Sequence, residues 1–277
     1  MAEGPAARRL ELDLDPHLTS ARTAAAAAEK LVVASTRNAH EGQLVALLVV
    51  EAITNVVRHG WRGAARDRIH LGLAVGGWMA EIHLRYPGAP FDWRAPELPP
   101  DASELREGGY GLVLIHSLAD HISPRSDGTV QELTLIRRMD RPAPAAPAAM
   151  PHEVLPMHCS IQRHGDSIVV TPEVPIIDAE VAVPFKEQLH AHLGQLERDG
   201  VSAPCVILDL HGVNFMDSSG LGAIISVRKT LGARGELRLA GVQPEVRALF
   251  ELTRLVRVLP LFDDVQQALA ARAAASR

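Results

Sequence analysis

VILDLHGVNFMDSSGLGAIISVRKTL, residues Val206 to Leu231, passes from an apolar strand through a short loop into an apolar helix. Asp217, Ser218 and Gly220 stand at the predicted start of that helix. Backbone N–H groups lack partners at such a point, so we place Ser218 at the cap position with its hydroxyl toward solvent. Gly220 admits the close approach of another backbone. A serine in this place is most often only a helix cap, and the position alone indicates no function.

Short apolar strands alternate with helical segments throughout the second half of the chain, which favours a mixed sheet with helices packed against it. Asp178 is expected to cap the first of these helices. The predicted strands span 158–163, 167–171, 205–210, 236–240 and 256–259. The predicted helices span 179–198, 219–231, 245–252 and 263–274.

The first half predicts a different architecture, an α+β sandwich with helices on one face of a largely antiparallel sheet. A strand is predicted at 8–15, with helices at 19–33, 42–60 and 112–119. Turn signals indicate two hairpins. The first joins 68–75 to 78–86 around Gly76-Gly77, and the second turns at Asp127-Gly128 and returns along 129–137. A proline-rich loop fills 87–109.

A segment rich in proline and alanine, RPAPAAPAAMPHE at 141–153, separates the two halves. Proline removes backbone donors and alanine buries little surface, so the segment is typical of an extended spacer. We therefore predict domains at 1–140 and 154–277, joined by this linker. The alternative is a surface loop inside one larger domain.

The composition narrows the class of protein. The chain has 277 residues, and 28 Lys and Arg stand against 33 Asp and Glu, so no basic field favours a nucleic-acid partner. No apolar run approaches the roughly 18 residues of a membrane span, and the N-terminus lacks a secretory core, so we expect a cytoplasmic protein. Cys159 and Cys205 lie in separate apolar runs without a metal-binding spacing, and we expect buried, reduced thiols.

Two sequence elements of the first half contain candidate catalytic or binding residues. Glu51 and Asn55 lie four apart on the predicted helix 42–60, so they share one face. A carboxylate there can accept a hydroxyl proton, while the amide oxygen binds Mg²⁺. The second element is EGGYGLVLI at 107–115, in which glycines precede an apolar helix and can bring backbone N–H groups close to phosphate. Either element alone is common in ordinary helices and loops.

Together, their order resembles the GHKL (Bergerat-type, histidine-kinase-like) ATPase superfamily, and within it the anti-sigma-factor serine kinases, over residues 8–138. The resemblance implies ATP and Mg²⁺ as cofactors, with Glu51 as the general base and Asn55 as the Mg²⁺ ligand. It also implies phosphorylation of a serine in a partner antagonist, alternating with capture of a sigma factor. The further nucleotide-binding residues that it implies are Gly88, Gly108, Gly109, Gly111 and Leu112.

One position departs from that family's pattern. Family members carry an acidic residue two positions before a glycine, which accepts a hydrogen bond from the adenine amino group, and here Tyr86 precedes Gly88. A tyrosine lacks the carboxylate acceptor. The loss of a charge-assisted hydrogen bond in a buried pocket costs about 1.5–3 kcal/mol, or roughly one to two orders of magnitude in affinity.

Residues 155–272 resemble a STAS domain of the anti-sigma-factor-antagonist type, on the strength of LDLHGVNFMDSSGLGAIISVRK. The resemblance makes Ser218 the phosphoacceptor and Ser219 the second choice, with Asp217 and Gly220 flanking them. A phosphate on Ser218 would add about −1.5 to −2 charges beside Asp217 and release a partner.

The hypothesis is a partner-switching regulator in which the first domain phosphorylates Ser218, in cis or on another copy. Its expected partners are a sigma factor, a STAS-domain or anti-sigma protein, a PP2C-type phosphatase and a second copy of the chain. The alternative is a non-catalytic scaffold with a degenerate nucleotide site. A histidine-kinase-like enzyme is disfavoured, because no dimerisation helix with a phosphoacceptor histidine precedes the first domain.

Overall fold

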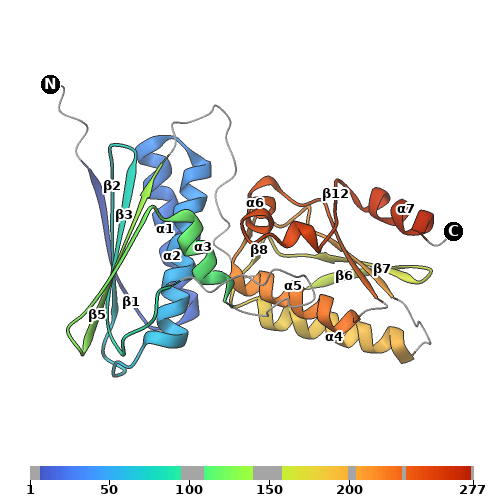
Figure 1. Ribbon diagram of the computed structural model, residues 1–277, viewed down its shortest axis with the longest axis horizontal. Helices are drawn as coiled ribbons and strands as arrows, with labels where there is room; N and C mark the ends of the chain where they lie inside the picture. The colour runs from blue at the N-terminus through green and yellow to red at the C-terminus, as the bar shows by residue number, and fades with distance from the viewer. Residues whose placement is uncertain (1–6, 95–108, 140–157, 199–203, 233–234, 276–277) are drawn as a thin grey trace. The chain divides into compact units, whose positions relative to one another are not determined.

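The computed structural model describes residues 7–94, 109–139, 158–198, 204–232 and 235–275 (Figure 1). They divide into two compact units, built mainly from the first and the second half of the chain, and each is described by itself. The predicted linker at 141–153 lies outside the described residues, so the boundaries 1–140 and 154–277 stay a prediction.

The first unit is the predicted antiparallel sheet with helices on one face (Figure 1). Its described strands run in the order β1-β2-β3-β5-β4, and every neighbouring pair is antiparallel. The strands are β1 Arg8–Leu14, β2 Ile69–Gly76, β3 Met79–Pro87, β4 His121–Ser126 and β5 Val130–Arg138. The helices are α1 Leu18–Thr36, α2 Ala39–Asn55, continued by the π-turn Val56–Gly60, and α3 Tyr110–Leu118.

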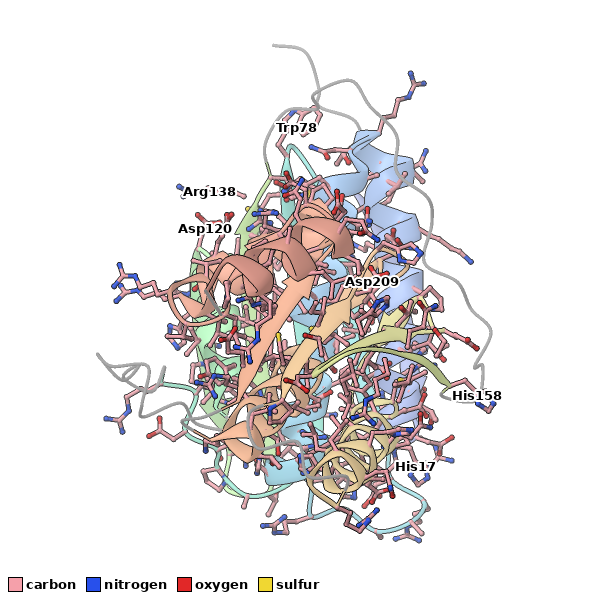
Figure 2. The ribbon with its side chains drawn as sticks, turned by 90° about the vertical axis from the view of Figure 1, so that its right-hand side faces the viewer. His17, Trp78, Asp120, Arg138, His158 and Asp209 are labelled. Atoms are coloured by element: carbon pink, nitrogen blue, oxygen red, sulfur yellow. The ribbon has the colours of Figure 1, made fainter. Side chains whose placement is uncertain are left out.

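The strands of the sheet show alternating burial, and two local backbone features set where helix α1 ends and helix α2 begins. Leu14 of β1 is buried while its neighbours on the outer face are exposed, as period-2 strands require. Helix α1 ends where Arg37 adopts a left-handed backbone, and Asn38 then caps α2 by accepting the Glu41 N–H. The two helices therefore turn back on each other within three residues. Trp78 lies at the tip of the β2–β3 hairpin (Figure 2).

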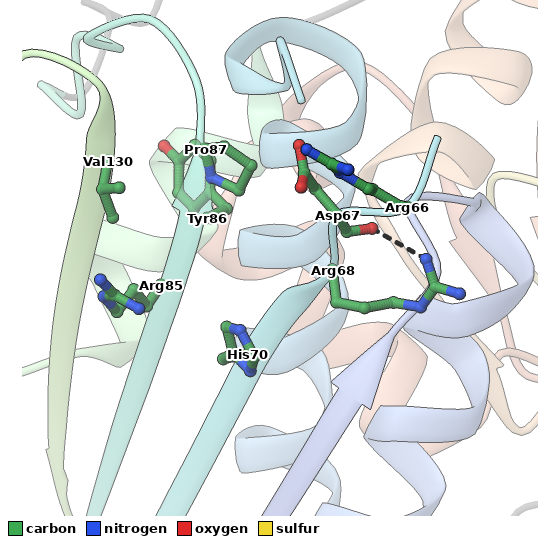
Figure 3. Close-up of a pocket in the computed structure, with 8 residues that line it drawn as sticks. All are labelled: Arg66, Asp67, Arg68, His70, Arg85, Tyr86, Pro87 and Val130. Carbon is green, nitrogen blue, oxygen red and sulfur yellow. Dashed lines mark hydrogen bonds between the residues drawn. The ribbon is translucent and has the colours of Figure 1, made fainter. Parts of the chain in front are cut away.

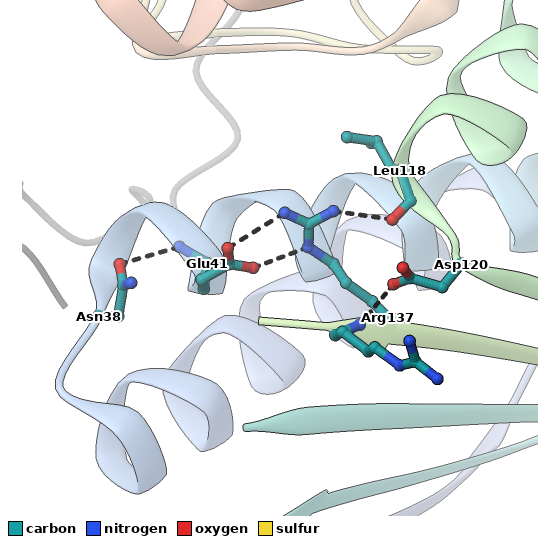
Figure 4. Close-up of polar contacts among 6 residues, drawn as sticks. Asn38, Glu41, Leu118, Asp120 and Arg137 are labelled. Carbon is teal, nitrogen blue, oxygen red and sulfur yellow. Dashed lines mark hydrogen bonds and ion pairs between the residues drawn. The ribbon is translucent and has the colours of Figure 1, made fainter. Parts of the chain in front are cut away.

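A buried ion pair links helix α2 to the sheet (Figure 4). The Arg137 guanidinium donates to both carboxylate oxygens of Glu41, at 2.7 and 3.1 Å, and to the Leu118 carbonyl at the end of α3. Glu41 is almost fully buried, so the pair is screened little by water. One side chain of β5 thus fixes the start of α2 and the end of α3.

Helix α2 and its π-turn are mostly apolar, although Glu41, Glu51 and Asn55 interrupt the pattern. Ala39–Gly60 is long and apolar enough to pass a length and composition test for a membrane span, and 72% of the most apolar stretch is buried. The sequence has no uninterrupted apolar run of roughly 18 residues, and this stretch passes the test on its average hydropathy although polar residues interrupt it. Its burial under α1 and the sheet accounts for that composition.

The second unit is the predicted mixed sheet with helices packed against it. Strand order is β12-β11-β9-β7-β6, with β6 and β7 antiparallel and the other pairs parallel. The sheet strands are β6 Cys159–His164, β7 Ser167–Pro172, β9 Cys205–Asp209, β11 Glu236–Ala240 and β12 Leu261–Phe262. The helices are α4 Ala182–Arg198, α5 Ser218–Leu231, α6 Pro244–Leu252 and α7 Val265–Ala275. Figure 1 shows α4 and α5 on one face of the sheet and α7 on the other.

Two predictions for this half are wrong, and one small sheet was not predicted. The strand predicted at 256–259 is wrong, because Leu255–Arg257 is a short 3₁₀ helix and the strand is β12. Helix α4 begins at Ala182 rather than Ala179, since Asp178 caps the turn before it. A two-stranded parallel sheet of β8 Ile176–Ile177 and β10 Phe215–Met216 was not predicted.

The two cysteines are both free, as expected. Cys205 is buried, whereas Cys159 is only partly buried, so full burial is wrong for Cys159. Burial raises the pKa of Cys159 to about 11 and raises that of Cys205 as well. Both therefore stay as thiols at neutral pH.

Candidate functional site

The start of α5 is organised by an aspartate rather than a serine. Asp217, 1% exposed, is the N-cap, and one of its oxygens accepts the N–H groups of Ser219 and Gly220 at 2.8 and 3.0 Å. The prediction that Ser218 occupies the cap position is therefore wrong. Ser218 is the first helical residue, because a carboxylate is a stronger acceptor for two N–H groups than a hydroxyl.

The two serines differ in access. Ser218 is partly exposed at the surface of the domain. The Ser219 hydroxyl oxygen is buried and has no hydrogen-bond partner among the described residues. Both serines are partly exposed as residues, but the buried hydroxyl of Ser219 would have to turn outward to accept a transferred group.

Close packing beneath the serines explains Gly220. A Cβ at this position would lie 2.5 Å from the Ile177 carbonyl oxygen and 2.6 Å from Met216. Ile177 and Met216 are paired in the small parallel sheet of β8 and β10. Glycine is needed here so that α5 can start directly against that sheet.

In the first unit, the structure brings Glu51 and Asn55 together at the end of α2, as predicted. Glu51 is 1% exposed and interacts with other residues, and Asn55 is the last α-helical residue before the π-turn. The Asn55 Nδ2 is buried and has no hydrogen-bond partner in the described structure. Buried amides are normally satisfied, and π-turns are frequent at functional sites, so this end of α2 is a candidate ligand site.

The glycine turn is described only in part. Gly109 has a φ of 91°, in the region that favours glycine, and Gly111 and Leu112 lie in the first turn of α3. Gly108 lies outside the described residues. A glycine with positive φ directly before a helix is consistent with a backbone that approaches an anion at the helix start.

Tyr86 occupies the inner face of the sheet, toward the helices. Its side chain is 1% exposed, and its ring lies so close to Gly60 that a Cβ there would be 3.0 Å from it. The Tyr86 hydroxyl makes no hydrogen bond of normal geometry, although the Trp93 side chain lies near enough to affect it. Burial raises the pKa of Tyr86 to about 12, and Trp93 acts in the opposite direction. The hydroxyl is therefore a neutral donor at physiological pH.

Gly88 has a packing role in this structure. A Cβ at Gly88 would lie 2.2 Å from the Gly60 carbonyl oxygen, which accepts the Ala89 N–H at 3.1 Å. Gln131, the cross-strand partner of Tyr86, is buried and donates to the Gly88 carbonyl at 3.0 Å. Contact with Gly60 therefore accounts for a glycine here, and a nucleotide contact stays a prediction.

Sequence reasoning missed an aromatic cluster beside Tyr86. The His59 and Phe91 rings are stacked with centroids 5.8 Å apart, and Phe91 meets Trp93 edge-on at 4.8 Å. His116 of α3 bonds to the Trp93 carbonyl at 2.7 Å. The only signal was the pair of aromatic residues in PFDW, which also fits an ordinary loop. The cluster joins the end of α2 to α3.

A cavity of about 390 Å³ opens near Tyr86 and Pro87 (Figure 3). Its wall carries several cations, but Arg68 is paired with Asp15 at 3.2 Å and Arg85 with Glu132 at 3.5 Å. Most of its positive charge is therefore already compensated at an exposed surface. The lining residues are Arg66, Asp67, Arg68, His70, Arg85, Tyr86, Pro87 and Val130.

The residues fit one end of a magnesium nucleotide better than the other. The glycine turn fits the phosphate end, and the unpartnered Asn55 Nδ2 is a donor that fits a phosphate oxygen, whereas a magnesium ion would need the Asn55 Oδ1. The buried ring of Tyr86 stands where the resemblance expects a carboxylate, and it does not fit the recognition of adenine. No cluster of three His, Cys, Asp or Glu within the described ranges could hold a metal by itself.

Comparison with known proteins finds a family match in each half of the chain. The histidine kinase-like ATPase domain family matches residues 13–137, and the STAS domain family matches 158–268. An anti-sigma F factor antagonist of Paenibacillus polymyxa is 35% identical over 23% of this chain and 56% of its own length. The serine-protein kinase RsbW of Oceanobacillus iheyensis is 35% identical over 27% of this chain and 51% of its own length. The chain thus spans about half the length of these two relatives.

Two further matches concern the second half. BtrV of Bordetella bronchiseptica, named as an anti-sigma factor antagonist, is 34% identical over 31% of this chain and 72% of its own length. A solved anti-sigma factor antagonist of Mycobacterium paratuberculosis is 23% identical, with a TM-score of 0.37, over 42% of this chain and 93% of its own.

The chain combines a histidine kinase-like ATPase domain with a STAS domain that follows it. It belongs to the anti-sigma factor antagonist family, and part of it is similar to the serine-protein kinase RsbW.

Proposed function

We propose that this chain is a partner-switching regulator in which Ser218 is the phosphoacceptor. The observation that carries the proposal is the buried Asp217 cap, which makes Ser218 the first residue of α5 at a partly exposed position. A phosphate on Ser218 would stand beside the buried Asp217 carboxylate and add about −1.5 to −2 charges. Repulsion and a larger hydrated group would then release a partner from this surface.

The kinase is proposed to be the first domain, acting in cis or on another copy. Glu51 would accept the proton of the attacking hydroxyl, and Asn55 would hold Mg²⁺. ATP, when bound, supplies the phosphoryl group. Gly109, Gly111 and Leu112 would lie beside its phosphates at the start of α3. The proposed setting is the cytoplasm, with a sigma factor or a second STAS or anti-sigma protein as partner and a PP2C-type phosphatase that resets Ser218.

Incubation with labelled ATP and Mg²⁺ tests the site and the kinase together. We expect label in the wild type and in the matched control Ser219→Ala, and none in Ser218→Ala or Glu51→Gln. Label that persists in Ser218→Ala would refute the phosphoacceptor. Intact-mass measurement on the same samples gives the number of phosphates per chain.

The buried Tyr86 favours a second candidate function, a non-catalytic scaffold whose first domain docks a partner without nucleotide. The reason is that its ring fills space at the adenine end of the site. Calorimetry with ATP and Mg²⁺ separates the two functions. Heat of binding below millimolar nucleotide supports the kinase, and its absence at millimolar nucleotide supports the scaffold.

A further inference from the structure

The turn between β2 and β3 carries a strained tryptophan. Gly76 and Met79 pair across the turn, and its two central residues, Gly77 and Trp78, have φ of 57° and 62°. These angles define a type I′ turn, which asparagine and glycine adopt readily. A bulky side chain at positive φ is a genuine outlier, and such strain persists where something else requires the residue.

The described fold leaves part of the indole exposed. Trp78 is 37% exposed and Met79 is 40% exposed, and they stand side by side among the exposed large apolar residues. The backbone of Trp78 is used, since its carbonyl accepts the Met139 N–H at 2.7 Å, but any residue supplies that carbonyl. Among the described residues, no aromatic stacking or cation–π contact involves this indole.

Three exposed arginines stand in register near the tip. Arg138 is the cross-strand partner of Met79, and Arg8 and Arg9 of β1 pair with the two residues that precede Gly76 on β2. One carboxylate, Asp120, accepts the Arg138 backbone N–H at 2.6 Å and keeps its negative charge, so the arginines outnumber it. Figure 2 shows Trp78, Asp120 and Arg138 near the same end of the domain.

We propose that Gly77, Trp78 and Met79, rimmed by Arg8, Arg9 and Arg138, form a docking site for a partner protein with an apolar pocket edged by carboxylates. Tryptophan and arginine are the residues that most often dominate binding energy at protein interfaces. Complementary charge at the rim raises the rate of association and makes it sensitive to salt. The site lies apart from Ser218 and needs no nucleotide.

Trp78→Gly is the informative variant. Glycine accepts positive φ without strain, so we expect the thermal midpoint of the full chain to stay equal or rise. A fall in the midpoint would show that the indole packs within the fold, and it would overturn the proposal. Gly128, at the exposed turn of the other hairpin, provides a matched position, because nothing lies within 4 Å of a Cβ there.

The partner is identified by a photoreactive phenylalanine analogue placed at position 78, with position 128 as the control, in the full chain inside its own cells. The protein cross-linked at 78 and not at 128 is purified, and its affinity for wild type and variants is measured without nucleotide. We expect at least a tenfold weaker Kd for Trp78→Gly and about a threefold weaker, less salt-dependent Kd for Arg138→Gln.

Equal affinities for wild type and Trp78→Gly would overturn the docking site. So would cross-links that form only within the chain, including its 141–153 segment, or equal cross-linking at 78 and 128. Labelling of Ser218 is measured in a separate experiment. Failure of the docking site therefore does not count against the proposed phosphorylation switch.

Discussion

The Asp217 carboxylate accepts the backbone N–H of Ala179 at 3.0 Å, across 38 residues of sequence. Its other oxygen accepts the Ser219 and Gly220 N–H groups. One buried side chain therefore satisfies three backbone donors and ties the start of α5 to the turn that precedes α4. The surface around Ser218 depends on this carboxylate.

Replacement of Asp217 by alanine should lower the free energy of unfolding by about 2–4 kcal/mol, because a cap is lost and buried donors are left unpaired. Urea denaturation of the full chain measures it. Asp264→Ala is the control, since Asp264 is exposed and accepts the Gln267 backbone N–H and, at 3.5 Å, its side-chain amide, and it should cost about 1 kcal/mol. Equal losses in the two variants would contradict the account of Asp217.

The Glu41–Arg137 pair should be far more important than its surface counterparts. Glu41→Gln leaves the Arg137 guanidinium without its carboxylate in a buried place, and we expect a loss of about 3–5 kcal/mol that changes little with salt. Asp15→Asn, which breaks the exposed pair with Arg68, should leave the urea midpoint nearly unchanged. A Glu41→Gln variant as stable as Asp15→Asn would show that Arg137 is held by its other contacts.

Tyr86 should make the fold sensitive to alkali. The pKa of Tyr86 is about 12 in the folded chain against 10.0 ordinarily, so the folded state holds the proton more tightly. This stability is complete below pH 10 and is lost as the pH rises from 10 to 12, by about 2–3 kcal/mol. Tyr86→Phe should remove that loss and cost little at pH 7, since the hydroxyl has no partner. Tyrosinate absorbance and urea midpoints, followed together against pH, check both points.

Nucleotide affinity should respond to the same position. Tyr86→Asp restores a carboxylate acceptor and removes the ring, so ATP with Mg²⁺ should bind about 10 to 100 times more tightly than to Tyr86→Phe. Calorimetry on both variants measures the ratio. Equal affinity in the two variants would mean that this position does not meet the base.

Gly88→Ala should destabilise the fold without any ligand. Its Cβ would lie 2.2 Å from the Gly60 carbonyl oxygen, so the strand end must move, at about 1–3 kcal/mol. Gly212→Ala is the control, because nothing lies within 4 Å of a Cβ at that exposed position. Thermal melting of the nucleotide-free chain compares them, and equal midpoints would show that the contact relaxes freely.

The sequence predicts an element well where a long pattern of alternating apolar residues fits only one kind of secondary structure. The strands of the β2–β3 hairpin lie within one residue of their predicted places because of their alternation, but the turn predicted at Gly76-Gly77 is wrong by one residue, since Gly76 pairs with Met79. The strand predicted at 256–259 fails because Leu255 and Leu259, four apart, are buried while Val256 is exposed. A four-residue apolar run is too short for its period to be recognised.

The site is predictable in its residues and less so in their roles. Glu51 and Asn55 follow from spacing and resemblance and lie on α2 as expected, whereas Ser218 lies inside α5 rather than at its cap. Asp217 and Ser218 are both good caps, so sequence could not show which one caps α5. The direction in which Tyr86 points, and its pairing with Gln131 across strands 45 residues apart in the chain, depend on tertiary packing.

The contact beneath Gly220 separates two meanings within the short motif Ser-Ser-Gly. A methyl group at this glycine would press on the Ile177 carbonyl, so the glycine answers to the architecture and would be retained even in a relative that had lost all signalling. Ser218, two residues before Gly220, is partly exposed and is proposed to carry the phosphate. Among relatives, the glycine would therefore be retained together with the fold, and the serine at position 218 together with phosphorylation.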